Sequence, residues 1–366
     1  MHIGLVGPLP PPSGGMANQT KQLAHLLTSE GIQVTLIQVN APYYPQWIGK
    51  FKGIRAFFRL IPYLYKLWQA SHSVQIFHVM ANSGWSWHLF SAPAIWIGYL
   101  KNKPVVINYR GGEAEAFFNK SIFWVRPSLK RTNAIIVPSA FLKHIFNKQG
   151  FEVTIVPNII DLDRFAAQTH EWNLPKIENR PHIILTRNLE SIYDNATAIR
   201  AFSIVKKNFP NAKLSIAGSG PEKAMLEQLA NNLDLVDSVT FLGRVDNSTI
   251  NDLYRQADIM INTSLVDNMP ISILEALACK VPVVSTNVGG IPFLVKHDET
   301  ALLVPPKSPA EIAAAIQFIL TNPEKTRKMV EAGYGMVQHY SWKHVRTQLM
   351  EIYERMLIGS KLITKS

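Results

Sequence analysis

The stretch from residue 258 to residue 278 reads Asp258-Ile-Met-Ile-Asn-Thr-Ser-Leu-Val-Asp-Asn-Met-Pro-Ile-Ser-Ile-Leu-Glu-Ala-Leu-Ala278 and contains three patterns in succession. An apolar run over 258–262 predicts a buried strand, and a polar loop follows it. Pro270 then stands where the first turn of an apolar helix would begin. A strand that leads through a loop into a helix is the repeating unit of parallel α/β folds, so this segment predicts one βα unit.

The same unit recurs on both sides of this segment. Short apolar runs bounded by Gly, Pro or Asn each precede a longer stretch of helical periodicity. Near-continuous β-branched runs predict strands that helices cover on both faces, as in a parallel sheet. The predicted strands cover residues 2–7, 33–39, 74–80, 105–109, 134–138 and 153–157 in the first half, and 182–186, 213–217, 238–242, 258–262, 281–285 and 301–304 in the second.

The length of 366 residues predicts two domains at about 150 residues each. The alternation lapses only in a polar, irregular stretch, so we expect an α/β chain of two doubly wound, Rossmann-like parallel-sheet domains, 1–165 and 182–340, with a linker over 166–181. Apolar residues at helical spacing predict a final helix within 341–366, which we place against the first domain. Ligands of such sheets bind at the carboxyl ends of the strands, so we expect the active site in a cleft between the facing domains.

The chain is strongly basic, because 37 Lys and Arg stand against 26 Asp and Glu and give a formal net charge of +11. This surplus predicts an anionic partner, and nucleic acid, an anionic membrane and a phosphorylated substrate all fit it. No nucleic-acid reader motif occurs, so we expect no nucleic-acid partner. A single cysteine, Cys279, excludes an intrachain disulfide and a cysteine-cluster metal site and fits a reducing compartment. The amino terminus lacks the positive region of a signal peptide, so we expect a cytoplasmic protein.

Two segments raise the question of a membrane. Residues 74–100 contain no Asp, Glu, Lys or Arg, but Gly84 and Pro93 would break a spanning helix, so we predict a strand, a loop and an apolar helix there. Residues 47–68 read WIGKFKGIRAFFRLIPYLYKLW, which interleaves cations with large apolar side chains. Two interpretations stay open: contact with an anionic leaflet on the inner face of the membrane, or an ordinary helix whose cations reach past apolar neighbours to water.

Two glycine-rich loops follow predicted strands. Gly14 and Gly15 precede a helix expected near 18–27, where the backbone can approach a ligand closely and unpaired N–H groups can bind phosphate. Gly218 and Gly220 precede a second helix in the same way. The first loop lacks the endings of a P-loop and of a dinucleotide fold. An ordinary turn, or close packing between strand and helix, remains the alternative at both places.

Three charged residues stand where such folds place their ligand contacts. Glu275 lies among apolar residues of its predicted helix, where a carboxylate is costly without a partner, and either ligand hydroxyls or an internal salt bridge would supply one. Arg110 and Arg187 each follow a predicted strand. A guanidinium at that position can neutralise a diphosphate and stabilise it as a leaving group.

Together these motifs point to one family. In chain order they are Pro12-Ser-Gly-Gly-Met16, Val156-Pro-Asn-Ile-Ile-Asp161, Ala217-Gly-Ser-Gly-Pro-Glu222, Phe241-Leu-Gly-Arg-Val245, residues 267–270, and Glu275-Ala-Leu-Ala-Cys-Lys-Val-Pro-Val-Val-Ser-Thr-Asn-Val-Gly-Gly-Ile-Pro292. With them, nearly the whole chain resembles the retaining GT-B glycosyltransferases, chiefly glycosyltransferase family 4, which use nucleotide-sugar donors. The resemblance implies that residues 1–165 form the acceptor side and residues 182–340 the donor side of a GT-B fold.

The resemblance also implies roles for single residues. Glu275 matches the family Glu that holds the ribose hydroxyls, Arg187 the Arg that binds the diphosphate, and Asp267 stands where a Glu contacts the donor sugar. We expect a catalytic contribution from Arg110 and Asp267, with no metal and no cofactor, because Arg187 and loop amides meet the charge of the leaving group. The residues expected on the donor or its nucleotide are Gly14, Gly15, Arg187, Gly218, Gly220, Asn268, Met269, Pro270 and Glu275.

The sequence departs from the family pattern at three places. Asp267 is one methylene shorter than the Glu expected there, and the phosphate Lys expected five or six residues after Arg187 is replaced by the stretch 193–195. Arg110 stands where a His commonly precedes the glycine pair. The main expectation is an active retaining glycosyltransferase. Because of these departures, a second hypothesis stays open: a non-catalytic partner subunit that binds a nucleotide sugar.

That enzyme would move a sugar from a nucleotide-diphosphate donor to a saccharide or lipid-linked acceptor, in the synthesis of a surface polysaccharide or glycolipid. A nucleotide-sugar epimerase shares the fold, but the Pro-Ser-Gly-Gly and Glu275 motifs fit the transferases better.

Overall fold

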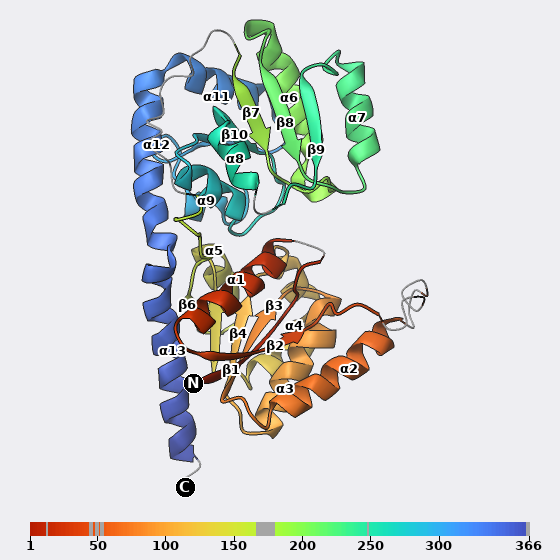
Figure 1. The fold of residues 1–366 in the computed structure, drawn as a ribbon, viewed down its shortest axis with the longest axis vertical. Coiled ribbons are helices and arrows are strands. Elements are labelled where there is room, and N and C mark those ends of the chain that lie inside the picture. The colour runs from red at the N-terminus through yellow and green to blue at the C-terminus, as the bar shows by residue number, and fades with distance from the viewer. Residues whose placement is uncertain are drawn as a thin grey trace. The chain divides into compact units, whose positions relative to one another are not determined.

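A computed structural model describes residues 1–11, 14–43, 47, 51, 55–165, 180–246 and 249–363. Contacts divide the chain into two units, the first made of Met1–Ile159 with Trp342–Ser366 and the second of Ile160–Ser341 (Figure 1). The first domain was expected to end at residue 165, so this division falls earlier. The backbone N–H of Ile160 donates to the carbonyl of Tyr340, 3.0 Å away, within the second unit. Most of the expected linker, residues 166–179, lies outside the described residues.

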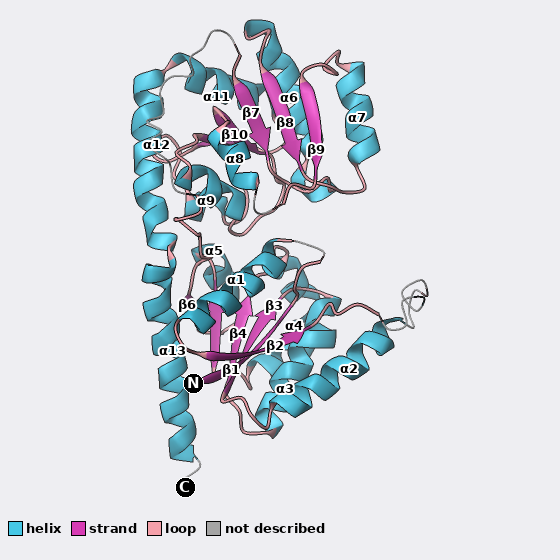
Figure 2. Ribbon diagram, in the orientation of Figure 1, coloured by secondary structure: helices cyan, strands magenta, loops and turns pink. Residues whose placement is uncertain are grey.

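All twelve predicted strands are present, with ends that shift by a few residues, and every ladder is parallel (Figure 2). The strands of the first unit are β1 (His2–Gly7), β2 (Gln33–Gln38), β3 (Ile76–Ala81), β4 (Val105–Tyr109), β5 (Ala134–Val137) and β6 (Thr154–Ile155). Those of the second are β7 (His182–Leu185), β8 (Lys213–Ala217), β9 (Val239–Gly243), β10 (Ile259–Asn262), β11 (Val283–Thr286) and β12 (Leu302–Val304). The repeated βα pattern therefore gives the expected α/β architecture twice.

Helices follow the strands in both units. The first unit has α1 (Gly15–Ser29), α2 (Arg55–Ala70), the π-helical turn η2 (Trp87–Ser91), α3 (Ala92–Leu100), α4 (Ala114–Leu129), α5 (Ala140–Lys148) and α13 (Trp342–Ile363). The second has η3 (Ser191–Tyr193), α6 (Asn195–Asn208), α7 (Lys223–Asn232), α8 (Ile250–Arg255), α9 (Ile271–Ala278), α10 (Ile291–Leu294), α11 (Pro309–Thr321), α12 (Pro323–Val337) and η4 (Gln338–Tyr340). The short helix expected near residues 18–27 is the middle of the longer α1.

Each sheet has six strands, and its order reverses once. In the first the order is β2-β1-β3-β4-β5-β6, and in the second it is β12-β11-β10-β7-β8-β9. The chain therefore changes direction across the sheet between β1 and β3 in the first unit and between β7 and β10 in the second. At such a point the loops after the two strands leave on opposite faces and open a crevice at the carboxyl edge of the sheet.

Alternate residues of one strand enter cores on opposite faces of the sheet. In β7, Ile183 and Leu185 join one buried cluster of the second unit, whereas Ile184 joins the other. In β4, Val105 and Ile107 lie on the opposite side from Val106. Strands β3, β4 and β10 are buried at every residue, which explains why their sequences are almost continuously apolar, whereas the edge strands β2 and β9 carry exposed residues.

The long helix α13 packs on the first unit. Its apolar positions Val345, Leu349, Ile352 and Met356 are buried in the same cluster as Leu23 of α1. The spacing of those four positions keeps them on one face of a helix, and that face is the buried one.

The charge-free stretch 74–100 forms β3, η2 and α3, as expected from its Gly and Pro residues. Within the part of the chain that the structure describes, no helix is both long and apolar enough to cross a bilayer.

Candidate functional site

Two of the expected site residues meet at the switch point of the second sheet. Arg187 follows β7, and Asp267 follows β10, the strand beside it. Arg187 Nη2 forms an ion pair with Asp267 Oδ2, and the side chains are only 13% and 14% exposed. The sequence placed both residues on the donor, but it did not predict that they would pair with each other.

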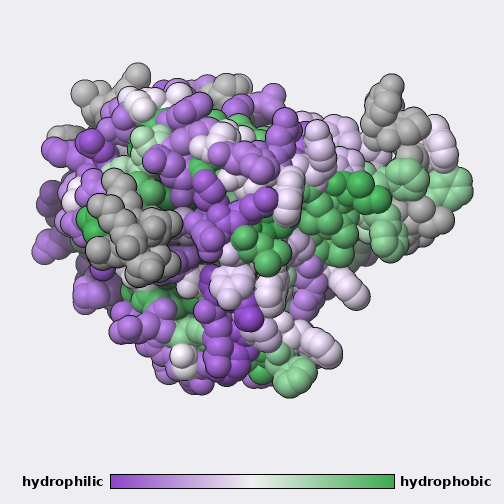
Figure 3. Space-filling view, turned by 90° about the horizontal axis from the view of Figure 1, so that it is seen from below, coloured by the Kyte–Doolittle hydropathy of each residue, from purple (hydrophilic) through white to green (hydrophobic). Residues whose placement is uncertain are grey.

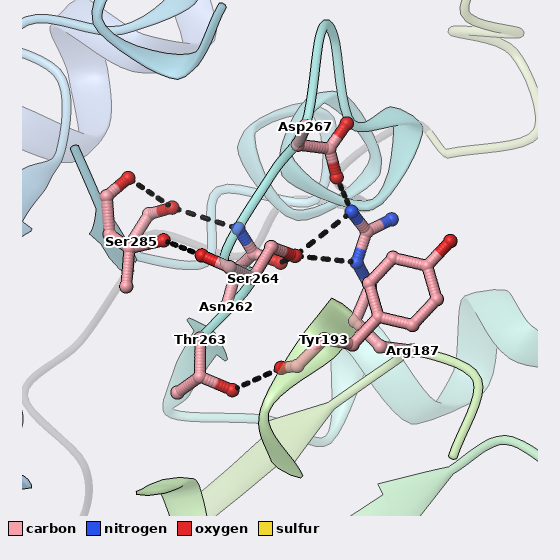
Figure 4. Close-up of polar contacts among 8 residues, drawn as sticks. Arg187, Tyr193, Asn262, Thr263, Ser264, Asp267 and Ser285 are labelled. Carbon is pink, nitrogen blue, oxygen red and sulfur yellow. Dashed lines mark hydrogen bonds and ion pairs between the residues drawn. The ribbon is translucent and has the colours of Figure 1, made fainter. Parts of the chain in front are cut away.

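The loop after β10 also fixes the Arg187 guanidinium from a second side (Figure 4). Ser264 Oγ accepts hydrogen bonds from Arg187 Nε at 3.4 Å and from Nη2 at 3.2 Å. The guanidinium carbon lies 4.5 Å from the ring centroid of Tyr193, a cation–π contact. The N–H groups of Nη1 make no hydrogen bond to a described residue, so the guanidinium keeps donors for an additional acceptor.

Ser264 belongs to a chain of hydrogen bonds in which each side chain accepts from one neighbour and donates to the next. Arginine can only donate, so Ser264 Oγ accepts from it and gives its own proton to Asn262 Oδ1, 2.9 Å away. Asn262 Nδ2 then donates to Ser285 Oγ at 3.0 Å, and Ser285 Oγ donates to the Thr286 carbonyl at 3.3 Å. Strands β10 and β11 thus hold the serine that orients Arg187.

Glu275 of α9 finds a partner that sequence reasoning missed. The Tyr254 hydroxyl donates to Glu275 Oε2 at 2.8 Å and is itself bonded to Thr186 Oγ1 at 2.8 Å. Burial raises the pKa of Glu275, while the Tyr254 hydrogen bond and the charges of Arg164 and Arg187 oppose that rise. Burial lowers the pKa of Arg187, and Glu275 is one of the groups that oppose this change.

The expected alternatives for Glu275 were an internal salt bridge and ligand hydroxyls. Its hydrogen bond goes to a tyrosine, and Oε1 makes none to any residue in the described ranges. The carboxylate is therefore held at one oxygen and available at the other.

Gly218 and Gly220 have a packing reason that is visible in the structure. A Cβ atom at Gly218 would overlap the carbonyl of Arg187, and one at Gly220 would overlap the carbonyl of Leu189. The Leu189 N–H donates to the Ser219 carbonyl at 3.1 Å, so the two loops lie against each other. These glycines let the loop that carries Arg187 approach the loop after β8 closely; the alternative stated for them was close packing between strand and helix, and the structure shows close packing between two loops.

Gly289 and Gly290 do the same for the loop that carries Asp267. A Cβ atom at Gly289 would overlap the Asp267 carbonyl, and one at Gly290 would overlap that of Asn268. Gly289 also has a φ of +54°, which disfavours other residues. The side chains of Asn268 and Met269 are buried, and Pro270 is the residue before α9. Gly289 and Gly290 belong to the motif that runs to Pro292, but the sequence alone did not predict this role for them.

Gly14 and Gly15 differ from these four glycines. Cβ atoms at either position would meet no heavy atom of a described residue within 4 Å. Both have room for a side chain and stand at the start of α1, while Pro12 and Ser13 of the same motif lie outside the described residues. The described residues thus show no packing requirement for glycine here, and the ligand role of this loop stays a prediction.

This contrast gives a prediction about stability. Gly218→Ala should lower the free energy of unfolding by about 1–3 kcal/mol, because the added methyl group overlaps backbone that cannot move without shifting Arg187. Gly14→Ala should leave it within about 0.5 kcal/mol of wild type, as at other uncrowded surface positions. Chemical denaturation of both variants tests this, and equal losses would contradict the packing argument.

Arg110 lies in the first unit at the end of β4, in a network of amide side chains. Its Nε donates to Asn108 Oδ1 at 3.0 Å, and Nη1 contacts the side-chain oxygens of Gln19 and Asn158. Gln19, Asn108 and Arg110 help to line a small cavity, and Val345 and Leu349 of α13 line it too. Burial lowers the pKa of Arg110 to about 10, so it remains a cation at neutral pH.

From Arg110 the hydrogen-bond network continues through Asn108 and His78 to α13, and the donor of each bond can be assigned. Asn108 turns its oxygen to Arg110, so its Nδ2 donates to His78 Nε2, 3.1 Å away. A neutral His78 then carries its proton on Nδ1 and donates it to the Tyr353 hydroxyl at 2.6 Å. Burial, and secondarily the charge of Arg110, lowers the pKa of His78 to about 3, in agreement with the neutral form.

Tyr353→Phe should therefore destabilise the protein. The substitution leaves the Nδ1–H of His78 buried without an acceptor, at a cost of about 1–3 kcal/mol. Thermal unfolding measures the loss, with Tyr65→Phe as the matched control because Tyr65 is 67% exposed. Equal stability of the two variants would show that the hydrogen bond to His78 contributes nothing.

Comparisons with known proteins match this architecture. The family model described as Glycosyltransferase Family 4 matches residues 13–164, and that described as Glycosyl transferases group 1 matches residues 167–336. Phosphatidyl-myo-inositol mannosyltransferase of Mycobacterium leprae is 24% identical, over 99% of each chain. An uncharacterised glycosyltransferase of Methanocaldococcus jannaschii is 34% identical over 39% of this chain, which spans only 37% of that protein.

Solved structures show the same fold. Sucrose-phosphate synthase of Thermosynechococcus elongatus has a TM-score of 0.75 and 19% identity, covering 98% of this chain and 99% of that one. HepE of Anabaena, solved with UDP-glucose, has a TM-score of 0.74 and 17% identity, covering 96% and 99%. Two adjoining family models and two Rossmann-like sheets agree, and the chain belongs to the family 4, group 1 glycosyltransferases of the GT-B fold.

Proposed function

We propose that this glycosyltransferase takes its sugar from a nucleotide-diphosphate donor and transfers it with retention of anomeric configuration. The acceptor is a saccharide or a lipid-linked molecule met at the inner face of a membrane, in surface polysaccharide or glycolipid synthesis. The bond between the anomeric carbon and the diphosphate oxygen breaks, the acceptor oxygen takes that place on the same face of the sugar, and the acceptor's proton passes to the departing diphosphate.

The observation that carries the donor site is the guanidinium of Arg187 at the switch point. Ser264 and Asp267 orient it, and the N–H groups of Nη1 remain for a phosphate oxygen. When the glycosidic bond breaks, negative charge develops on the diphosphate, and a fixed cation there stabilises it without a metal ion. HepE, solved with UDP-glucose, supports a nucleotide-sugar donor.

Other residues of the proposal have narrower roles. Glu275 accepts ribose hydroxyls at the oxygen that Tyr254 leaves available, and Asp267 contacts the donor sugar from its place beside Arg187. From the first unit, Gly14 and Gly15 supply open backbone and Arg110 a cation. The lipid acceptor is supported by the name of the mannosyltransferase relative, which contains phosphatidyl-myo-inositol.

A non-catalytic partner subunit is the second candidate, because no Lys follows Arg187 at the family position. Thermal-shift measurements with a panel of UDP-, GDP- and ADP-sugars, followed by product detection, separate the two. We expect one donor to raise the melting temperature and to be hydrolysed or transferred by wild type. Binding without turnover over a panel of acceptors would favour the partner subunit, and neither binding nor turnover would refute both.

A further inference from the structure

Helix α2 of the first unit has an apolar face on each side. One side packs inward, because Tyr63, Leu67 and Ala70 are buried in the core beside the first sheet. The other side is exposed, although the five large side chains on it are apolar or aromatic. This outer stripe consists of Phe57, Phe58, Ile61, Tyr65 and Trp68, which are between 48% and 67% exposed.

The spacing makes these residues one surface. Phe57, Ile61, Tyr65 and Trp68 follow each other at intervals of four, four and three residues, which keeps them on one side of a helix. Figure 3 shows apolar side chains, in green, gathered toward the side of the molecule where Figure 1 places α2. A helix that only covers a core would carry polar residues here, so the outer stripe needs another explanation.

The chain segment that carries the stripe is basic and contains no acid. No Asp or Glu occurs between Glu30 and Glu113, a stretch that contains the whole of α2 and α3. Lys66 is exposed on α2, and Lys101, just after α3, places Nζ 3.6 Å from the ring centroid of Trp68. The guanidinium carbon of Arg59 lies 4.2 Å from the ring centroid of Tyr43. Lys101 therefore contacts the stripe directly, and Lys66 is exposed on the same helix.

We propose that the outer stripe of α2 is a docking surface for an anionic lipid bilayer. Aromatic and aliphatic side chains would enter the boundary between headgroups and acyl chains, while Lys66 and Lys101 meet the phosphates. Helix α2 has 16 residues and lies along the membrane instead of crossing it. Residues 48–50 and 52–54 of the basic sequence segment fall outside the described residues, so the surface rests on α2 and Lys101.

An anionic bilayer and a second copy of this chain are the two candidate occupants of the stripe, and charge favours the bilayer. A symmetric dimer through the stripe would place a basic helix without acids against an identical one, and like charges in contact disfavour that pairing. An anionic leaflet supplies the opposite charge and an apolar interior together. The proposed function includes a location at a membrane, and the stripe is the surface that would bind there. Binding through this surface does not depend on the transfer reaction.

The test is co-sedimentation of the full chain with vesicles, without donor or acceptor. One set of vesicles is phosphatidylcholine alone, and the other also contains phosphatidylglycerol. We expect binding to the anionic vesicles that weakens as salt is raised. The triple variant Phe57→Ser, Ile61→Ser, Tyr65→Ser should lose this binding about tenfold or more, because its apolar contacts are gone.

The matched control is Phe123→Ser with Trp124→Ser, an exposed aromatic pair on α4 of the same unit. It should bind the vesicles as wild type does, and circular dichroism confirms that both variants are folded. Absence of wild-type binding, or equal loss in both variants, would overturn the proposal. A dimer that only the stripe variant disrupts, without vesicle binding, would identify a second copy as the occupant and overturn it equally.

Discussion

Replacing Arg187 with alanine is expected to lower donor turnover by about 100- to 1,000-fold, the usual effect of removing one preoriented group that stabilises developing charge. The guanidinium is fixed before the donor arrives, since Ser264 and Asp267 hold it and the ring of Tyr193 lies against it. No reorganisation is then needed as the diphosphate takes up charge. The effect should appear mainly in kcat, measured as release of the nucleoside diphosphate with the donor found in the panel.

Two controls make this result interpretable. Arg187→Lys keeps the charge but loses the planar fork, so its turnover should fall between wild type and alanine. Arg200→Ala removes an exposed arginine from α6 of the same unit and should change nothing. Arg187→Ala also leaves Asp267 without its partner, so the assays must run below the melting temperature of each variant. A folded Arg187→Ala protein with turnover near wild type would remove Arg187 from the mechanism.

The sequence predicted the strands well because their signal is local. An apolar run followed by helical periodicity needs no information from distant residues, and all twelve strands appear where such runs occur. The order of the strands is a tertiary property, yet the rule for switch points still placed Arg187 and Asp267 at the correct edge. The exact division between the units was not predictable, because Ile160 and Phe165 enter the core of the second unit while polarity rises only after them.

The site was predicted less completely than the fold. Tyr254 lies 21 positions before Glu275 and reaches it only through the packing of α8 beside α9, so no local pattern indicates their hydrogen bond. The glycine loops show the same limit. Gly14 and Gly218 look alike in sequence, but the first has open space around it and the second lies against backbone. The backbone that crowds a glycine comes from another part of the chain.

Glu275→Gln is expected to change the stability of the protein and its affinity for the donor in opposite directions. Burial raises the pKa of Glu275 in the folded protein, so the folded state holds this proton at higher pH than the unfolded chain does. The free energy of unfolding should then fall as pH rises from the unfolded pKa through the folded one. Glutamine does not ionise, so the variant should lose this pH dependence and be at least as stable as wild type at neutral pH.

Donor binding should change in the opposite direction. A carboxylate accepts hydroxyl hydrogen bonds worth about 1.5–3 kcal/mol each, so its loss should raise the Kd of the donor about 10- to 100-fold. Glu227→Gln is the matched control, because Glu227 forms an exposed pair with Lys223 on α7 and should affect neither property. Isothermal titration with the donor and unfolding curves from pH 4 to 8 measure the two effects. A variant that is less stable yet binds the donor normally would show that Glu275 supports the fold through Tyr254 and does not hold the nucleotide.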